Sequence, residues 1–190
     1  MGSGQGQDDP PGQARVRVIR PATSADAEAM RQVERAAGVQ FVDVGMAFVA
    51  EHEPIDAVTL ASYAADGRSW VATDDEDQPV GYLIVDSSGH DAHIEQVSVD
   101  PRYQGRGIGR GLVEEAEHWA EQNGFDGVTL TTFREVPWNL PLYEHLGYSV
   151  LREDELSAEL KGIRDHETER GLDPETRVCM RKAISRTRSG

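Results

Sequence analysis

A glycine-rich stretch of six residues, 104–109, has the residue types and spacing of an anion-binding loop. It reads Gln-Gly-Arg-Gly-Ile-Gly, and arginines lie before, within and after it. A β-branched run at 93–99 precedes it, and apolar residues recur at helical spacing from Ile108 onward. Glycine lets the backbone approach a ligand closely, and the first N–H groups of a helix have no partner inside that helix. We therefore expect an anion to bind here, between a strand and a helix.

Two well-known phosphate-binding loops fit this stretch poorly. A P-loop carries Lys and then Ser or Thr after its last glycine, whereas Gly109 is followed by Arg110 and Gly111. A dinucleotide-binding fingerprint needs its third glycine one residue later, and it needs an acid at the end of the next strand. Here Asp126 precedes the next strand. Neither class of nucleotide site is favoured.

The stretch resembles instead the acetyl-CoA loop of the GNAT superfamily of N-acetyltransferases, whose signature is Gln/Arg-x-x-Gly-x-Gly/Ala between a strand and a helix. The preceding Val-Ser-Val-Asp-Pro-Arg-Tyr is also of that family's type. A second block, at 131–148, resembles the family's Asn-x-x-x-Tyr-Glu-x-x-Gly-Phe/Tyr, which here starts at Asn139 and ends at Tyr148. Together the two blocks make the resemblance specific.

The resemblance implies how acetyl-CoA, the co-substrate of that superfamily, is held. The pantetheine arm pairs with the exposed backbone of the strand at 93–99, because this strand splays from its parallel neighbour at 127–133. The diphosphate binds the backbone amides of the glycine loop and a neighbouring arginine. The cofactor-binding residues implied in this way are Val97, Val99, Gln104, Gly105, Arg106, Gly107, Ile108, Gly109, Arg110, Asn139 and Tyr143. Arg102 is expected to be ordinary surface charge.

Acetyl transfer to an amine also needs a base for the ammonium and an acid for the leaving thiolate. His93, Glu95 and Val97 are expected on one face of their strand because side chains alternate. The resemblance places a glutamate base of histone acetyltransferases at His93, and an acid or water of other members near Glu95. We favour Glu95, with His93 and a water relay as alternatives. Both can also be ordinary sheet residues.

Tyr143 matches the family tyrosine whose hydroxyl lies near the sulfur. A phenol with a pKa of about 10 can donate its proton to a thiolate of similar basicity. The alternative is a core aromatic in a short amphipathic helix. Trp138, beside the cofactor asparagine, is expected to wall the acceptor pocket or simply to pack.

Hydrophobic spacing and turn residues predict the elements that position these blocks. Strands are expected at 15–20, 69–73, 80–85, 93–99, 127–133, 148–151 and 177–184, and helices at 26–37, 41–51, 55–65, 108–122, 139–146 and 154–170. Gly38 is expected to end the first helix, and Gly45 to interrupt the second. The predicted fold is the α/β GNAT fold: a mixed, mostly antiparallel central sheet with a splayed parallel strand pair and helices on both faces.

Length and composition constrain the class of protein. The 190 residues suit one domain at 15–184, between a disordered tail at 1–14 and a frayed end at 185–190. No apolar run reaches membrane-spanning length and no signal peptide is recognised, so a cytoplasmic enzyme is expected. The lone Cys179 rules out an intramolecular disulfide and is expected in the core.

The net charge of −15 argues against a nucleic-acid partner and would attract a cationic substrate, although acidity can also serve solubility alone. We therefore predict an N-acetyltransferase that uses acetyl-CoA, no metal and no covalent enzyme intermediate. The expected acceptor is a small primary amine such as a polyamine, an amino sugar or an amine antibiotic. The alternatives are acetylation of a protein lysine or N-terminus, and a non-catalytic acyl-CoA-binding sensor. No membrane partner is expected, and a homodimer is left open.

Overall fold

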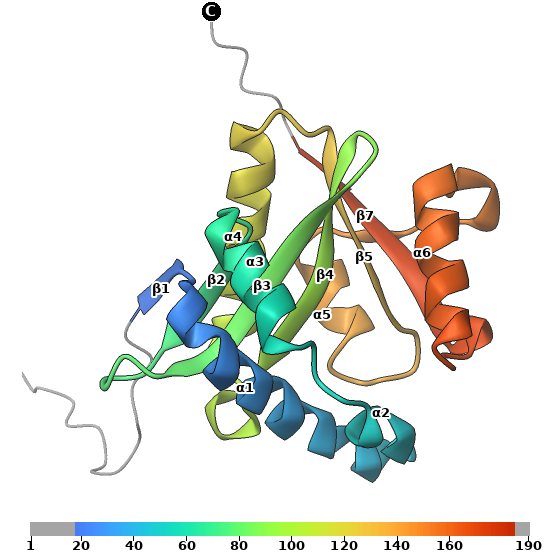
Figure 1. Cartoon of the computed structure of the whole chain (residues 1–190). Coiled ribbons are helices and arrows are strands. Elements are labelled where there is room, and N and C mark those ends of the chain that lie inside the picture. Colours follow the sequence, from blue (N-terminus) through green and yellow to red (C-terminus); the bar gives the residue numbers. More distant parts are fainter. Residues whose placement is uncertain (1–17, 185–190) are drawn as a thin grey trace, which may run out of the picture.

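The computed structural model describes residues 18–184, which form one seven-stranded sheet flanked by helices (Figure 1). The strands lie side by side in the order β1-β2-β3-β4-β5-β7-β6. Their bounds are Val18–Pro21 (β1), Ser69–Thr73 (β2), Pro79–Ser88 (β3), Asp91–Val99 (β4), Gly127–Phe133 (β5), Ser149–Val150 (β6) and Arg177–Ala183 (β7). β4 and β5 pair in parallel, whereas the other neighbouring strands within 18–184 pair antiparallel. The mixed, mostly antiparallel sheet is confirmed, and the two predicted tails lie outside the described residues.

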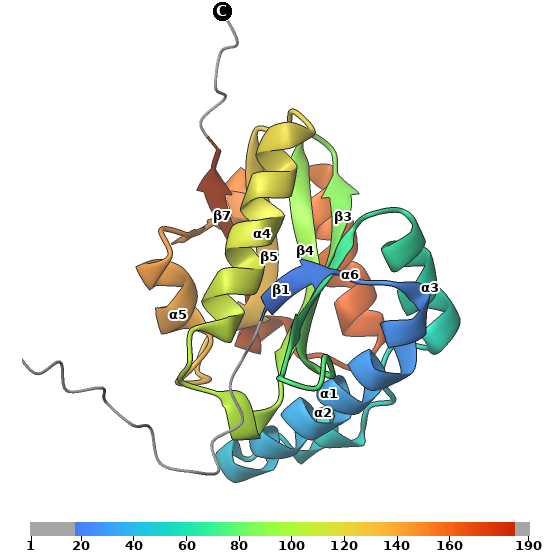
Figure 2. The same cartoon turned by 90° about the vertical axis from the view of Figure 1, so that its left-hand side faces the viewer.

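Helices cover both faces of the sheet, as expected. Their bounds are Ala27–Val39 (α1), Ala47–Glu51 (α2), Ala57–Ala65 (α3), Ile108–Gln122 (α4), Leu140–His145 (α5) and Ala158–Glu169 (α6). α4 and α5 pack on one face, while α1, α3 and α6 pack on the other. Figure 2 shows α4 in front of the sheet and α6 behind it. None of the helices described is both long and apolar enough to cross a membrane.

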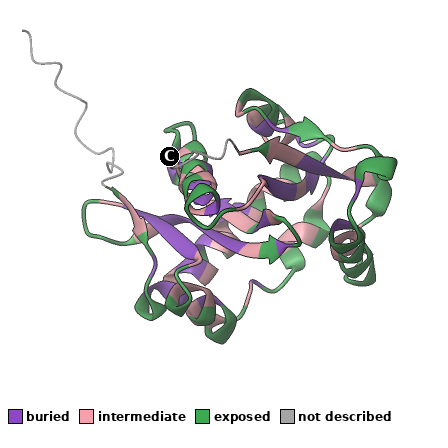
Figure 3. Cartoon of the chain, turned by 90° about the horizontal axis from the view of Figure 1, so that it is seen from above, coloured by how far each residue is buried: buried purple, intermediate pink, exposed green. Residues whose placement is uncertain are grey.

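Alternation of side chains along β3 contributes to two of the hydrophobic cores. In β3, Leu83 and Val85 face the core beneath α4, whereas Tyr82 and Ile84 face the core beneath α1 and α3. All four side chains are fully buried. Figure 3 shows the buried residues concentrated along the strands and the inner faces of the helices. β3 is therefore covered on both sides, which makes it a rigid support for its neighbour β4.

Gly38 does not end the first helix as predicted. α1 continues through it to Val39 and then tightens into a 3-10 turn, Gln40–Val44. A Cβ added at Gly38 would lie 3.5 Å from the Cα of Ala50, an ordinary van der Waals distance, so α2 packs over this position. Gly45 does interrupt the following segment, with a φ of 78°. Gly38 is thus an interior residue of α1, and the prediction that it ends this helix is wrong.

The third small core lies beneath α6. Cys179 of β7 is buried there with Leu156 and Leu160, and burial raises the pKa of its thiol to about 11. This agrees with the core role expected for the lone cysteine. Ser157 caps α6 by accepting a hydrogen bond from the backbone N–H of Leu160. α6 is thereby held against the same face of the sheet as α1 and α3.

Candidate active site

The two parallel strands separate halfway along their length. β4 and β5 pair only from Asp91 to Ile94 and from Gly127 to Leu130. Figure 1 shows them close at their upper ends and apart below. A cleft of about 860 Å³ opens where they part, and residues 95–99 and 131–133 line it. The splay predicted for this strand pair is therefore present, and it leaves the edge of β4 that faces β5 without a strand partner in the described structure.

A β-bulge at Glu95 corrects the predicted arrangement of side chains on β4. Val85 of β3 pairs with Ile94 and Ile84 pairs with Gln96, so Glu95 is the extra residue. The alternation therefore shifts by one residue. Val97 joins Ile94 on the face packed beneath α4 and does not share a face with His93. The bulge turns the exposed Glu95 side chain into the cleft.

The glycine loop has the conformation of an anion-binding turn at the start of α4. Gly105 and Gly107 have φ values of 74° and 76°, a region that glycine adopts without steric cost. Gly107 is the N-cap residue of α4, and Ile108 begins the helix. The loop residues Gln104, Gly105, Gly107, Ile108, Gly109 and Arg110 line the cleft. The first amides of a helix of 15 residues thus lie at one end of it.

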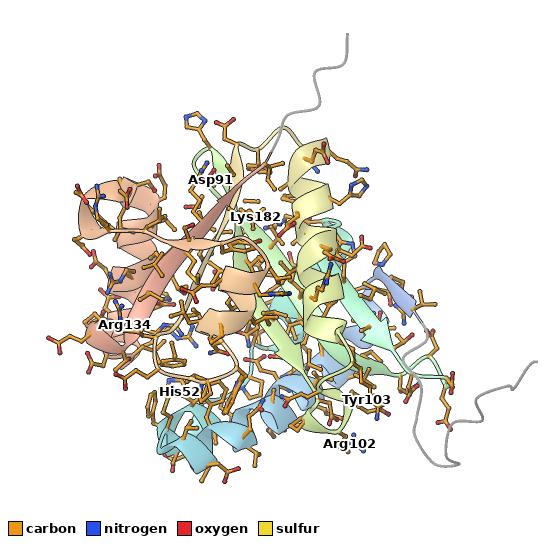
Figure 4. The ribbon with its side chains drawn as sticks, turned by 180° about the vertical axis from the view of Figure 1, so that it is seen from behind. His52, Asp91, Arg102, Tyr103, Arg134 and Lys182 are labelled. Carbon is orange, nitrogen blue, oxygen red and sulfur yellow. The ribbon has the colours of Figure 1, made fainter. Side chains whose placement is uncertain are left out.

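The side chains of the glycine loop have defined partners within the chain. Gln104 donates its side-chain amide to the carbonyl oxygen of the Gln40 side chain at 2.7 Å, and Arg110 pairs with Glu114 at the same distance. The guanidinium of Arg106 lies over the ring of Tyr103. Arg102 pairs with Asp100, in agreement with its expected surface role. Figure 4 shows Arg102 and Tyr103 next to one another in the loop before α4.

Asn139 and Tyr143 enter the cleft from α5, on the side of the glycine loop. The Tyr143 side chain is buried, and its hydroxyl makes no hydrogen bond to a residue that the structure describes. Burial raises the pKa of Tyr143 to about 12, although the charge of Arg177 opposes this rise. The phenol is therefore protonated at neutral pH. Its ring packs edge-on against Tyr148 at 5.9 Å between centroids.

Glu95 and His93 have different environments although both line the cleft. Desolvation by the cleft walls raises the pKa of Glu95, and the carboxylates of Asp86 and Glu167 raise it further. His93 is buried, and Nδ1 lies 2.9 Å from the hydroxyl oxygen of Thr129. Burial lowers the pKa of His93 to about 4, so the imidazole is neutral at physiological pH. Of these two cleft residues, Glu95 has the higher pKa and is therefore the stronger base.

A network on α6 and β7 lies beside these residues and was not predicted. The guanidinium of Arg177 and the hydroxyl of Thr131 both donate hydrogen bonds to the carboxylate of Glu167, each with a donor–acceptor distance of 2.5 Å. The side chains of Arg177 and Glu167 are only 11% and 16% exposed. His52, which follows α2 and is labelled in Figure 4, contacts the end of α6. Its Nε2 lies 3.3 Å from the backbone oxygen of Arg170. No local motif marks these residues, since Arg177 and Glu167 are 10 positions apart, Thr131 and Glu167 are 36 apart, and His52 and Arg170 are 118 apart.

An aromatic wall closes the cleft beyond the splayed end of β5. The ring centroid of Phe133 lies 5.8 Å from that of Phe41 and 6.5 Å from that of Phe48, and the ring centroids of Trp138 and Phe41 are 5.7 Å apart. The guanidinium of Arg177 lies over the Phe133 ring at 4.5 Å. Trp138 therefore both packs and lines the cleft, which combines the two roles expected for it.

Comparison with known proteins agrees with this geometry. The model of a family described as the acetyltransferase (GNAT) family matches residues 31–148. Peptidyl-lysine N-acetyltransferase YjaB of Salmonella typhimurium is 27% identical over 97 residues, which are 51% of this chain and 61% of that protein. The Escherichia coli protein of the same name is 29% identical over 97 residues, which are 51% of this chain and 60% of that protein. The match thus spans about three fifths of the length of these relatives.

Among solved structures, the PaiA N-acetyltransferase of Thermoplasma acidophilum in complex with coenzyme A superimposes with a TM-score of 0.65. The two proteins are 16% identical, and the superposition covers 87% of this chain and 98% of that one. At this level of identity the likeness shows a shared fold.

Proposed function

Because the chain belongs to the acetyltransferase (GNAT) family, we propose that it transfers the acetyl group of acetyl-CoA to a primary amine, by direct attack in a ternary complex. The observation that carries the proposal is the cleft that opens where β4 leaves β5. This cleft joins the glycine loop and the start of α4 to Glu95, and so connects an anion-binding turn with a candidate base. Both features are needed for amine acetylation.

The residues present fit acetyl-CoA. The unpaired edge of β4 at Val97 and Val99 is available for hydrogen bonds to the pantetheine arm, and Asn139 lies across the cleft from it. A Cβ built at Gly105 or Gly107 would have no neighbour within 4 Å, so both glycines border open space. The amides of residues 105–109 would bind the diphosphate, with Gln104, Arg106 and Arg110 around them. Bound acetyl-CoA supplies a thioester whose acetyl group an unprotonated amine can attack.

We assign proton removal to Glu95. Its raised pKa makes this carboxylate a better proton acceptor than an ordinary glutamate, directly or through one water. His93, with a pKa near 4, is the weaker base and is held by Thr129, so we assign it to positioning of the strand. An ammonium has an ordinary pKa of about 10.4, so a base is required near neutrality.

We assign proton donation to Tyr143. Its hydroxyl holds a proton at neutral pH because burial raises its pKa to about 12, and no described residue competes for that proton through a hydrogen bond. The proton would pass to the sulfur that leaves with coenzyme A. Since a phenol and a thiolate are of similar basicity, the transfer needs little driving force.

A small amine is the acceptor we propose, and a peptidyl lysine is the second candidate. The names of the two bacterial relatives favour a peptidyl lysine, although only 51% of this chain aligns with them. The contact between His52 and the end of α6 favours the first, because it joins α2 to α6 beside the cleft and narrows the approach for a polypeptide.

The test is release of coenzyme A from acetyl-CoA against a panel of amines, amino acids and a lysine peptide, with Tyr143→Phe alongside. We expect turnover on at least one acceptor. In Tyr143→Phe we expect the turnover rate to fall by about 10²- to 10⁴-fold, the usual contribution of a positioned acid. The fold should be unchanged, because the hydroxyl makes no hydrogen bond within the described residues, and calorimetry should still detect acetyl-CoA binding to the glycine loop and the edge of β4. Binding without turnover on any acceptor would support the sensor alternative instead.

A further inference from the structure

We infer that the acceptor carries an anionic group, such as a carboxylate, as well as its amine, and that Glu95 and Arg170 bind the two ends. This inference rests on the proposed function, since it names the class of acceptor for the same cleft. It narrows the expected small amine to a zwitterion of the amino-acid type.

Most charged side chains that line the cleft are already neutralised. Among its four arginines, Arg35 pairs with Glu53, Arg110 with Glu114 and Arg177 with Glu167. Arg170 makes no side-chain hydrogen bond or ion pair within residues 18–184. It is therefore the positive charge of the cleft that is left for a ligand.

The acids of the cleft show the same pattern. Glu34 accepts hydrogen bonds from the hydroxyl of Tyr82 at 2.6 Å and from the backbone N–H of Ile55. Glu167 is held by Arg177, and Glu159 interacts with Ser157 at the start of α6. Glu95 has no hydrogen-bonding partner among the described residues. One carboxylate and one guanidinium thus remain in the same cleft.

These two charges lie within electrostatic reach but are not bonded to each other. Arg170 lines the same cleft as Glu34 and Glu95, and its positive charge opposes the rise that desolvation gives to the pKa of both carboxyl groups. Glu95 and Arg170 nevertheless form no ion pair with each other among the described residues. Both side chains line one cleft of about 860 Å³, where each can pair with the complementary charge of a bound molecule.

Charge complementarity distinguishes this acceptor from the other amines. An ammonium beside Glu95 satisfies one end of the site in every case. A diamine would bring its second cation toward Arg170, which is unfavourable, whereas a carboxylate can form a bidentate pair with a guanidinium. A neutral amide or ester at that position would leave the guanidinium without a counter-charge.

Arg170 belongs to a part of the chain that the family model does not cover. The match ends at residue 148, whereas Arg170 follows α6, Ala158–Glu169. The backbone oxygen of Arg170 lies 3.3 Å from Nε2 of His52, which holds this residue beside the cleft. Acceptor selectivity would then come from a residue outside the matched segment, while residues within that segment hold the cofactor.

The test compares pairs of acceptors that differ only in the carboxylate. We would measure kcat/KM for coenzyme A release with lysine and 1,5-diaminopentane, with phenylalanine and 2-phenylethylamine, and with 4-aminobutyrate, 6-aminohexanoate and their methyl esters. We expect the carboxylate member of the best pair to be preferred about tenfold or more, the effect of one hydrogen bond between charged groups. The ω-amino acids of different length report the span between the two charges.

In Arg170→Gln, the ratio of kcat/KM between the carboxylate member and its partner should fall close to one, mainly because KM for the carboxylate member rises. Its backbone oxygen survives this change, so the contact with His52 is kept. Lys161→Gln is the matched control. Lys161 is an exposed cation of α6, the helix that Arg170 follows, and it does not line the cleft. The control should keep the wild-type preference. Acetyl-CoA affinity, measured by calorimetry, should be the same in all three proteins.

Equal or better turnover on the members without a carboxylate, or on a lysine peptide with blocked ends, would overturn the inference and leave the proposed function standing. So would a preference that survives Arg170→Gln. Absence of acetyl-CoA binding and of turnover on every acceptor would overturn the proposed function and the inference together.

Discussion

The carboxylate of Glu95 owes its position to one extra residue in β4. In a regular strand the alternation would place it opposite a residue of β3, but the bulge leaves it unpaired and turned into the cleft. There, reduced solvation and two other carboxylates favour its protonated form. Bulges of this kind are known next to active sites, where they redirect a side chain. The candidate base is thus defined by a local irregularity of the backbone.

Replacing Glu95 by Gln should lower kcat by about 10²- to 10⁴-fold, since a positioned base contributes about this much. A base acts in its ionised form, and the pKa of Glu95 is raised. The wild-type kcat/KM should therefore fall as the pH drops through a value above that of an ordinary glutamate. This acidic limb should be missing in the variant.

The measurement is a pH–rate profile from pH 4.5 to 9 for both proteins, with Asp165→Asn as a control. Asp165 is an exposed acid on α6 that does not line the cleft. If Glu95→Gln keeps both the rate and the acidic limb, the base lies elsewhere and the assignment to Glu95 is wrong.

At the scale of the element, the junction between the glycine loop and α4 depends on two backbone conformations. Gly107 is left-handed, with a φ of 76°, whereas Gly109 lies within α4 in ordinary helical geometry. A Cβ at Gly109 would meet only Leu142 and Val99, both at 3.9 Å. The backbone conformation thus favours glycine at 107, whereas alanine fits at 109, where the family's signature also allows it.

Gly107→Ala should cost about 1–2 kcal/mol of unfolding free energy, because L-residues are disfavoured in the left-handed region. Gly109→Ala should be neutral or stabilise α4 by up to about 1 kcal/mol, because alanine is the better helix former. Urea unfolding of the two variants checks this difference. Gly107→Ala should also weaken acetyl-CoA binding in calorimetry, because it disturbs the turn that presents the amides. Equal stability of the two variants would contradict the role given to the left-handed turn.

At the scale of the whole molecule, the cleft lies between parts of the chain that are distant in sequence. β4 and α4 supply one side, α5 the second, and α1, α2 and α6 the third. A ligand that spans these parts binds the folded chain and not the unfolded chain, so it must stabilise the fold.

Acetyl-CoA at 100 times its Kd should stabilise the protein by about 2.7 kcal/mol. For a domain of this size, that corresponds to a rise in Tm of about 5–10 °C. Differential scanning fluorimetry across a series of acetyl-CoA concentrations measures the rise. Gly107→Ala should need more acetyl-CoA to reach the same rise, and an unchanged Tm in the wild-type protein would refute the proposed cofactor site.

The sequence by itself was sufficient for the parts of the site that local geometry defines. Alternating apolar residues, turn residues and the two motif blocks predicted the strands, the helix after the glycine loop and the parallel pair that splays. The left-handed glycines belong to this class, since the conformation of a turn depends on residues a few positions apart. The candidate residues Glu95, Asn139 and Tyr143 were found in the same way, and they line one cleft.

Only the tertiary structure decided how the acceptor half of the cleft is built. The bulge at Glu95 depends on the register between β3 and β4, which no short motif encodes. Gly38 lies inside a helix where its type predicted a stop, and α2 packs against that part of α1. Arg170 reaches the cleft because α6 packs on the same face of the sheet as α1. Such contacts join segments far apart in sequence, so they follow from the order of the strands and the packing of the cores, and not from local pattern.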